Sequence, residues 1–165
     1  MHSYDDIIKA KSLYFLGKNI VRKNLSNNIN IKKIINKKDI ELAYDLQAGN
    51  YIKRVIKKKK WAKSFALEAS NIINHYTKKN STLMDAGSGE LTSLIDILNC
   101  LEDKFSKSFA FDISLSRLIL GINYMKKELK SIKKPEIFCA ELSSIPLPQN
   151  SVDTSMTVHS LEPNS

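Results

Sequence analysis

Residues 81–91 read STLMDAGSGEL, and this stretch decides the fold that the sequence predicts. Its first half is a short apolar run that ends on Gly87 and Gly89, a pattern typical of a buried strand entering a tight turn. Apolar residues then recur at helical spacing over residues 91–101, so a helix is expected after the turn. A strand, a glycine turn and a helix in this order indicate the first half of a βαβ unit.

The same alternation continues toward the C-terminus. Residues 108–112 are a second strand by pattern, and residues 115–129 have the spacing of an amphipathic helix with Ser114 as its cap. Two further strands are predicted within residues 135–140 and 152–158. Strands that alternate with helices predict an α/β fold, here a Rossmann-like parallel sheet behind a helical N-terminal leader.

The predicted boundary between leader and domain falls near residue 50. Residues 1–49 are polar and are expected to be partly helical, with a short helix over residues 6–17. Residues 50–165 are expected to form the domain, whose Rossmann core starts at residue 81.

Apolar side chains recur at steps of three and four between residues 51 and 76. The pattern lapses at the lysines 57–60, so it predicts either two helices or one helix with an exposed middle. The larger side chains of this segment, Trp61 and Phe65 among them, are expected in the core.

Charge is unevenly distributed along the chain. The 165 residues carry a net charge of +9, but residues 1–80 hold 18 Lys or Arg against 6 Asp or Glu, whereas residues 81–165 hold 8 against 11. Such asymmetry is typical of a segment that binds nucleic acid or another anionic surface. Lys, Ile and Asn together make up 57 residues, however, and a bias toward A/T-rich codons produces a lysine-rich solvated surface by itself. The solvated surface is the favoured interpretation, and nucleic acid stays an open, less favoured alternative.

The sequence predicts a reduced, cytoplasmic protein. Its only cysteines, Cys100 and Cys139, lack CxxC spacing and are expected to be two ordinary buried thiols. No run approaches the ~18 apolar residues that a bilayer span needs, and the N-terminus lacks a signal-peptide pattern. No His, Cys and Asp cluster has metal-ligand spacing, so no metal site is expected.

The glycine turn and Asp112 together indicate a nucleoside-containing cofactor. Glycines let the backbone approach a ligand closely, and an acid at the end of the second strand can accept both hydroxyls of a ribose. A dinucleotide site wants a third glycine where this chain has Thr92, and Asp85 would repel a pyrophosphate. An acid suits a cofactor with a cationic amino-acid group, so charge favours S-adenosylmethionine over NAD.

Several segments resemble motifs of the class I S-adenosylmethionine-dependent methyltransferases, of the type-11-like group. LMDAGSGELTSL (residues 83–94) looks like their first motif, and FAFDIS (109–114) looks like the second-strand motif with its ribose acid. CAELSSIPLPQNSVD (139–153) is similar to the stretch that holds adenine, and SVDTSMTVHSLEPN (151–164) to the fourth strand and its loop. Residues 43–51 are more weakly similar to a leader segment that closes over the cofactor.

The resemblance implies a set of cofactor contacts. Asp85 would orient the methionyl amino group and Asp112 would bind the ribose. Ile113 would pack against the adenine, whose amino group would be held by Glu141 with the help of the Leu142 amide. The cofactor-binding residues implied in this way are Asp85, Ala86, Gly87, Gly89, Asp112, Ile113, Glu141, Leu142 and Tyr51.

The sequence departs from the family pattern at two of these motifs. Leu91 stands where a third glycine is frequent, and Glu141 stands where an Asp is common. The alternatives for the site residues stay open at this point: Asp112 as a simple helix cap, Glu141 as an exposed loop acid and Tyr51 as a packing aromatic.

The implied reaction is methyl transfer by in-line displacement to an unidentified acceptor, either a small molecule or a macromolecule. The enzyme's main task is then to hold the acceptor in line with the methyl carbon. His159, expected at the end of the fourth strand, is the candidate general base for a hydroxyl acceptor, with a structural or substrate-shaping role as the alternative.

The resemblance implies that the four strands lie in the spatial order 3-2-1-4. The resembled family continues past the fourth strand, so the chain is expected to be a truncated form that ends after it. Strand 152–158 would then be an open hydrophobic edge, where a protein partner could bind. Two functional hypotheses follow. The first is a methyltransferase, and the second is a catalytically inactive remnant that serves as a binding module for a protein or RNA.

Overall fold

The computed structural model describes residues 37–158, with side chains from residue 40 onward. The chain divides between Ala48 and Gly49 into two units, which are described separately. The first contributes helix α3 (Lys37–Leu46). The helix predicted over residues 6–17 lies outside the described residues. The second unit contains α4 (Asn50–Lys57), α5 (Lys59–Tyr76), β1 (Ser81–Ala86), α6 (Thr92–Cys100), β2 (Phe105–Asp112), α7 (Leu115–Glu128), β3 (Glu136–Cys139) and β4 (Thr154–Met156).

The four strands form one parallel sheet in the order β3-β2-β1-β4, as predicted. The register aligns Asp85 of β1 with Ala110 of β2 and with Met156 of β4. Asp112, the last residue of β2, is aligned with Cys139, the last residue of β3. The carboxyl ends of β1, β2 and β3 therefore meet at one edge of the sheet.

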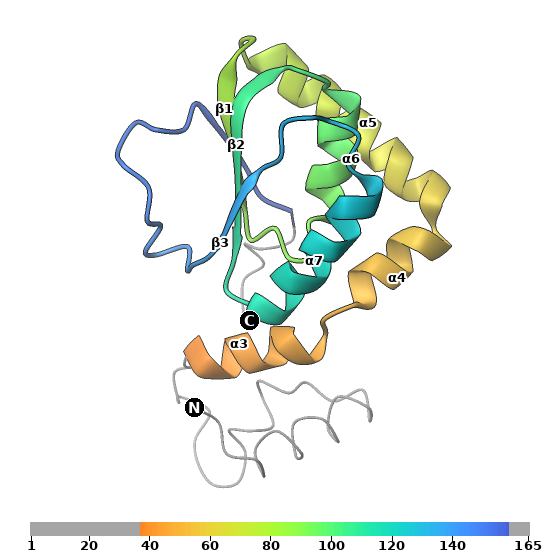
Figure 1. Cartoon of the computed structure of the whole chain (residues 1–165), viewed down its shortest axis with the longest axis vertical. Coiled ribbons are helices and arrows are strands. Elements are labelled where there is room, and N and C mark those ends of the chain that lie inside the picture. The colour runs from red at the N-terminus through yellow and green to blue at the C-terminus, as the bar shows by residue number, and fades with distance from the viewer. Residues whose placement is uncertain (1–36, 159–165) are drawn as a thin grey trace, which may run out of the picture. The chain divides into compact units, whose positions relative to one another are not determined.

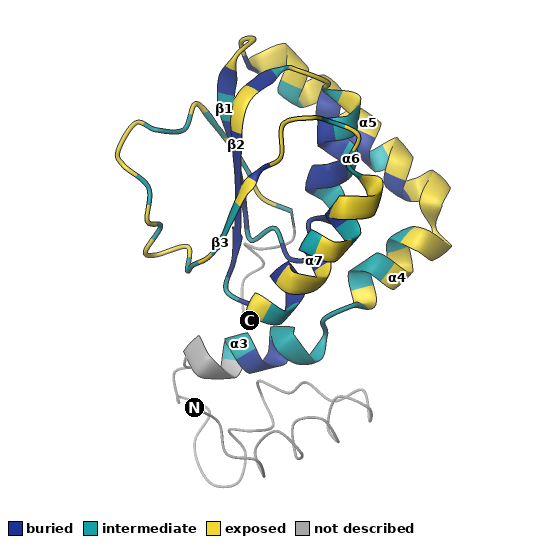
Figure 2. Ribbon diagram, viewed as in Figure 1, coloured by how far each residue is buried: buried dark blue, intermediate teal, exposed yellow. Residues whose placement is uncertain are grey.

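Helices α5, α6 and α7 lie along one face of the sheet, and the segment between β3 and β4 runs on the other side (Figure 1). The core lies between the sheet and these helices, and the ribbon of β1, β2 and α6 is largely dark blue in Figure 2. Leu83 of β1 and Ala110 of β2 are fully buried. Burial of aliphatic side chains from both layers stabilises this arrangement. The buried core cluster consists of Leu83, Leu91, Leu94, Ile95, Leu98, Phe105, Ala110, Leu118 and Met125.

The turn between β1 and α6 is tightly packed against α7. Leu91 has a left-handed backbone with φ of 58°, and its side chain is fully buried. A left-handed conformation is unfavourable for leucine, so burial of the side chain must offset the strain. Gly121 of α7 faces this turn, because a Cβ there would lie 2.8 Å from the backbone of Glu90.

The helical segment before β1 is two helices with a break at Lys58, one of the two predicted alternatives. The prediction that Trp61 lies in the core is wrong, and Phe65 is only half-buried. The buried residues of α5 are Ala62, Ala66 and Ser70, while Trp61 is 49% exposed. Small residues let α5 pack closely on α6, and this leaves the bulkier side chains beside the contact line.

The prediction of two buried thiols is also wrong, since Cys100 and Cys139 are both exposed, and neither forms a disulfide within the described residues. Cys100 is the last residue of α6. Cys139 ends β3, an edge strand of only four residues that leaves its outer side to solvent.

The close approach at Gly121 gives a stability prediction. Gly121→Ala should destabilise the protein by about 1–3 kcal/mol, because the new methyl group collides with the backbone of Glu90. Helix propensity alone would give a gain of up to about 1 kcal/mol, so the two effects have opposite signs. Urea unfolding measures the change. Asn123→Ala, at an exposed position of the same helix, is the matched control, and a stabilised Gly121→Ala would contradict the packing.

Candidate functional site

The glycine turn is held in place by the acid at the end of β2. The Gly89 N–H donates to Oδ2 of Asp112 at 2.8 Å, and the Ser114 N–H donates to Oδ1 at 2.9 Å. Gly87 and Gly89 have φ of 73° and 53°, values that glycine adopts without strain. Asp112 thus accepts one hydrogen bond at the N-terminus of α7 and another from the glycine turn. A carboxylate has roughly four acceptor positions, so positions remain for a ligand's hydroxyls.

Asp85 lies at the end of β1 and is almost completely buried, with 2% of its surface exposed. Its Oδ1 has no hydrogen-bond partner among the described residues. Burial, and secondly the charge of Asp112, raise the pKa of Asp85 to about 7. A buried carboxylate oxygen without a donor is a favourable position for a cationic group of a ligand.

Glu90, between Gly89 and Leu91, caps a helix that is distant in the sequence. Its fully buried carboxylate accepts the N–H groups of Gly49 at 2.9 Å and Ile52 at 2.7 Å, with the Tyr51 N–H at 3.5 Å. These amides form the N-terminus of α4, where N–H groups lack partners within the helix and the helix dipole favours negative charge. The carboxylate therefore ties α4 to the glycine turn.

Arg117 completes this connection. Its guanidinium lies against Gly89, where a Cβ would collide with it, and 5.1 Å from the ring centroid of Tyr51. Its Nε is 4.0 Å from Oε1 of Glu90. Arg117 thus lies over the turn, and Tyr51 lies over Arg117. Only glycine at position 89 leaves room for this arrangement.

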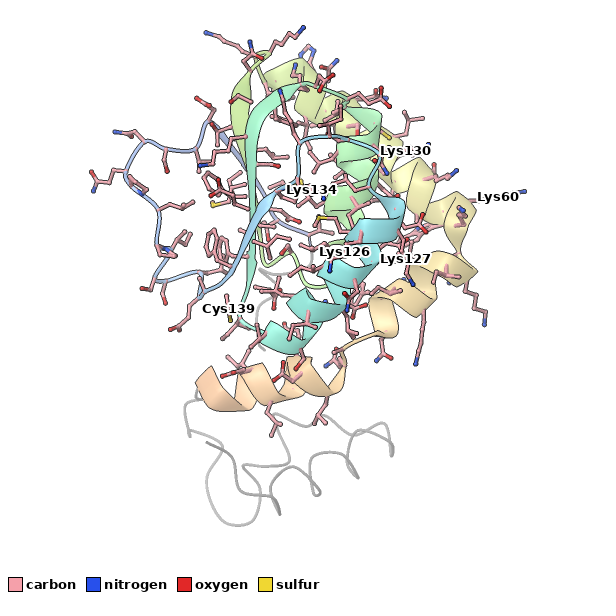
Figure 3. The ribbon with its side chains drawn as sticks, in the orientation of Figure 1. Lys60, Lys126, Lys127, Lys130, Lys134 and Cys139 are labelled. Carbon is pink, nitrogen blue, oxygen red and sulfur yellow. The ribbon has the colours of Figure 1, made fainter. Side chains whose placement is uncertain are left out.

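The residues predicted to surround adenine lie beyond β2 and β3. Ile113 is half-buried, and its carbonyl accepts the Cys139 thiol at 3.4 Å. The Ala140 N–H donates to the Asp112 carbonyl at 3.1 Å, which keeps the chain after β3 close to the end of β2. Glu141 is half-buried in a tight turn closed by Ser144, and Leu142 is 46% exposed. Cys139 marks this end of β3 in Figure 3.

The structure brings most of the predicted site residues to one edge of the sheet. Asp85 and Ala86 end β1, Gly87 and Gly89 form the turn, and Asp112 joins that turn to β2. The remaining described members are Ile113, Glu141, Leu142 and Tyr51. His159 lies outside the described residues. No group of three or more His, Cys, Asp or Glu side chains within residues 40–158 could hold a metal ion.

Sequence reasoning missed Glu90 and Arg117. Glu90 stands between a glycine and a buried leucine. This position is unusual for a glutamate, because glutamate side chains are normally exposed to solvent. Arg117 precedes Gly121 and Met125 by steps of four and eight, on the buried side of α7. A charge on the apolar stripe of an amphipathic helix was the available signal.

The acidic side chains of the site fit a cofactor with a cationic group better than one with a diphosphate. Asp85, Glu90 and Asp112 are all buried carboxylates beside the same turn. A phosphate placed there would meet negative charge, whereas the unpartnered oxygen of Asp85 suits an ammonium group. The free acceptor positions of Asp112 suit ribose hydroxyls. The residues present therefore fit S-adenosylmethionine.

Comparison with solved structures identifies the fold. A Methanococcus maripaludis protein assigned as an S-adenosylmethionine-dependent methyltransferase matches with a TM-score of 0.51 and 20% identity, over 81% of this chain and 55% of that one. A protein from the complex of the Haloferax volcanii Trm112 methyltransferase activator with its assigned methyltransferase matches with a TM-score of 0.50 and 16% identity, over 69% and 46%.

The chain has the class I methyltransferase fold, and it spans about half the length of these two solved proteins. No protein-family model and no curated protein sequence matches it.

The carboxylate of Glu90 gives a testable prediction. Glu90→Gln should destabilise the protein by about 2–4 kcal/mol, because the amide –NH₂ of Gln would face N–H donors of α4 in a buried place. Urea unfolding gives the loss, and hydrogen exchange at Ile52 should show lost protection. Glu102→Gln, at an exposed position, is the control. Unchanged exchange at Ile52 would contradict the capping role.

The raised pKa of Asp85 predicts a pH dependence of stability. From about pH 4 to pH 7 the folded state holds a proton that the unfolded state has released, so the free energy of unfolding falls as pH rises through this window. Asp85→Asn should remove this slope and make the protein about 1–4 kcal/mol more stable above pH 7. Urea unfolding across pH tests this, with exposed Asp103→Asn as control. A slope that persists in Asp85→Asn would refute the assignment.

Proposed function

We propose that this protein is an S-adenosylmethionine-dependent methyltransferase, or the cofactor-binding part of one. The single observation that carries the proposal is the unpartnered, buried carboxylate oxygen of Asp85 beside the glycine turn. A cationic amino group is the ligand chemistry that relieves an unpartnered buried carboxylate. The class I methyltransferase fold, and the two similar proteins assigned as methyltransferases, support this proposal.

The proposed roles of the residues follow from their places. Asp85 accepts the methionyl ammonium, and Asp112 accepts the ribose hydroxyls while it holds Gly89. Ile113 packs against the adenine, and Glu141 takes its amino group with the Leu142 amide. Ala86, Gly87 and Gly89 provide close access to the backbone.

We propose that Tyr51 contributes to the cofactor site from its position over Arg117, whose guanidinium lies against Gly89. The hydrogen bonds from the α4 amides to Glu90 fix this position. In this proposal α4 closes one side of the cofactor site, and Glu90 is a positioning residue rather than a contact.

Bound S-adenosylmethionine supplies a methyl carbon that is already activated by its sulfonium. The protein's part is to hold the acceptor in line with that carbon, an effect of proximity and orientation. If the acceptor is a hydroxyl, we propose His159 as the base that takes its proton. The acceptor is left open between a small molecule and a macromolecule.

The proposal includes a protein partner at the edge of β4 and a cytoplasmic location. β4 has three residues, and among the described residues it pairs only with β1. The Haloferax volcanii protein is found in a complex with the Trm112 activator, which supports a partner in general terms. Two exposed cysteines that form no disulfide within the described residues suit a reducing compartment.

Calorimetric titration with S-adenosylhomocysteine tests the proposed function. The protein should bind it, and Asp112→Asn should weaken binding at least about tenfold, equivalent to roughly 1.4 kcal/mol, because Asn accepts fewer hydrogen bonds than a carboxylate. Glu136→Gln, at the opposite end of the sheet, is the control and should bind normally. NAD should not bind. A folded protein without affinity for S-adenosylhomocysteine would overturn the proposal and favour a non-catalytic binding module.

A further inference from the structure

The junction of α4 and α5 has a strongly basic surface. We define the α4–α5 corner as residues 53–63. Between residues 50 and 67 the chain has seven basic residues and no Asp or Glu. All seven are exposed, and they are Lys53, Arg54, Lys57, Lys58, Lys59, Lys60 and Lys63. Lys60 projects from this corner in Figure 3.

Two apolar side chains are exposed among these cations. Ile56 is 63% exposed and Trp61 is 49% exposed. The guanidinium of Arg54 lies 5.1 Å from the centroid of the Trp61 ring, and Trp61 stacks on Phe65 at 6.2 Å. The indole is therefore held at the surface by a cation and a neighbouring ring.

Two of the seven cations interact with a carboxyl group of the protein itself. Burial and Glu128 raise the pKa of Asp96 in α6, and Lys63 and Lys59 act in the opposite direction. These two lysines are thus near an internal carboxylate. The outer cations of the corner are Lys53, Arg54, Lys57, Lys58 and Lys60, and within residues 40–158 none of them lies in an ion pair.

The combination of lysines with exposed Trp and Ile favours one class of partner. Nucleic-acid sites favour the planar fork of arginine alongside lysine, and this corner has a single arginine, which already lies over Trp61. Aliphatic side chains gain nothing from a phosphate backbone, but they gain free energy at the interface of a bilayer. Trp prefers the headgroup level, and lysines near an anionic leaflet contribute about 1 kcal/mol each.

We propose that the α4–α5 corner docks on an anionic phospholipid surface, with Ile56 and Trp61 at headgroup level and the outer lysines against lipid phosphates. The proposal concerns binding at a surface. No helix of residues 37–158 is long and apolar enough to cross a bilayer. It is independent of the cofactor site.

Vesicle flotation with tryptophan fluorescence tests this docking. Trp61 is the only tryptophan of the chain, so its emission reports on the corner directly. The full chain should float with vesicles of phosphatidylcholine and phosphatidylglycerol, and Trp61 emission should shift to the blue. Vesicles of phosphatidylcholine alone should bind at least about tenfold more weakly, and salt should reverse the anionic binding.

Two triple variants with the same change in charge separate a local site from general attraction. Lys57→Gln/Lys58→Gln/Lys60→Gln should lower affinity for the anionic vesicles at least about tenfold. Lys126→Gln/Lys127→Gln/Lys130→Gln, near the end of α7, should retain most of it (Figure 3). Both variants should bind S-adenosylhomocysteine like the unmodified protein, so a failure of lipid docking is distinguishable from a failure of the proposed function.

Four results would overturn the proposal. Equal binding to both kinds of vesicle, or an equal loss in both triple variants, would show that no charged site exists at the corner. Corner-dependent binding of tRNA without binding to vesicles would assign the surface to nucleic acid. A blue shift that depends on protein concentration in the absence of lipid would assign it to a second copy of the chain.

Discussion

The contact between the Glu90 carboxylate and the N-terminus of α4 is the interaction on which the rest of the site depends. It joins residues 41 positions apart in the sequence, at 2.9 Å for the Gly49 N–H, and the Glu90 side chain is fully buried. Both parts need it: a short helix such as α4 is marginal by itself, and a buried carboxylate without donors is costly. The carboxylate supplies an acceptor for the N–H groups of α4, and these N–H groups supply donors for the carboxylate. Arg117 adds a cation beside the carboxylate and separates Tyr51 from the glycine turn.

Three buried carboxylates stand beside this turn, and their hydrogen bonding differs. Asp112 accepts two backbone N–H groups, and Glu90 accepts those of α4. Asp85 has an oxygen without a donor among the described residues. The protein therefore supplies hydrogen-bond donors to two of the three acids beside the turn, and an oxygen of the third lacks one. This asymmetry, more than the glycines, explains why a cationic ligand suits the site, since glycine turns also serve phosphate cofactors.

The sequence predicted the sheet well because parallel βαβ units leave few topological choices. The glycine turn and the Ser114 cap of α7 follow from local patterns, and the strand order was implied by the resemblance to the methyltransferase family. The capping of α4 by Glu90 does not, because the partner is 41 residues away and its donors are backbone groups without a sequence signature. Trp61 was wrongly predicted to lie in the core for a related reason. Hydrophobicity marks which side chains prefer burial, but close helix packing selects small ones such as Ala62 and Ala66.

The uneven charge of the chain takes on a different meaning once these contacts are known. The basic segment before β1 contributes backbone N–H groups and the Tyr51 ring to the acidic turn, and the seven basic side chains between residues 50 and 67 are exposed to solvent. Arg117, the cation that does lie at the turn, comes from the acidic half of the sequence. The lysines are therefore not neutralising partners of the buried carboxylates. Their positive charge is available to a partner outside the chain, and the exposed Ile56 and Trp61 among them restrict which partner that can be.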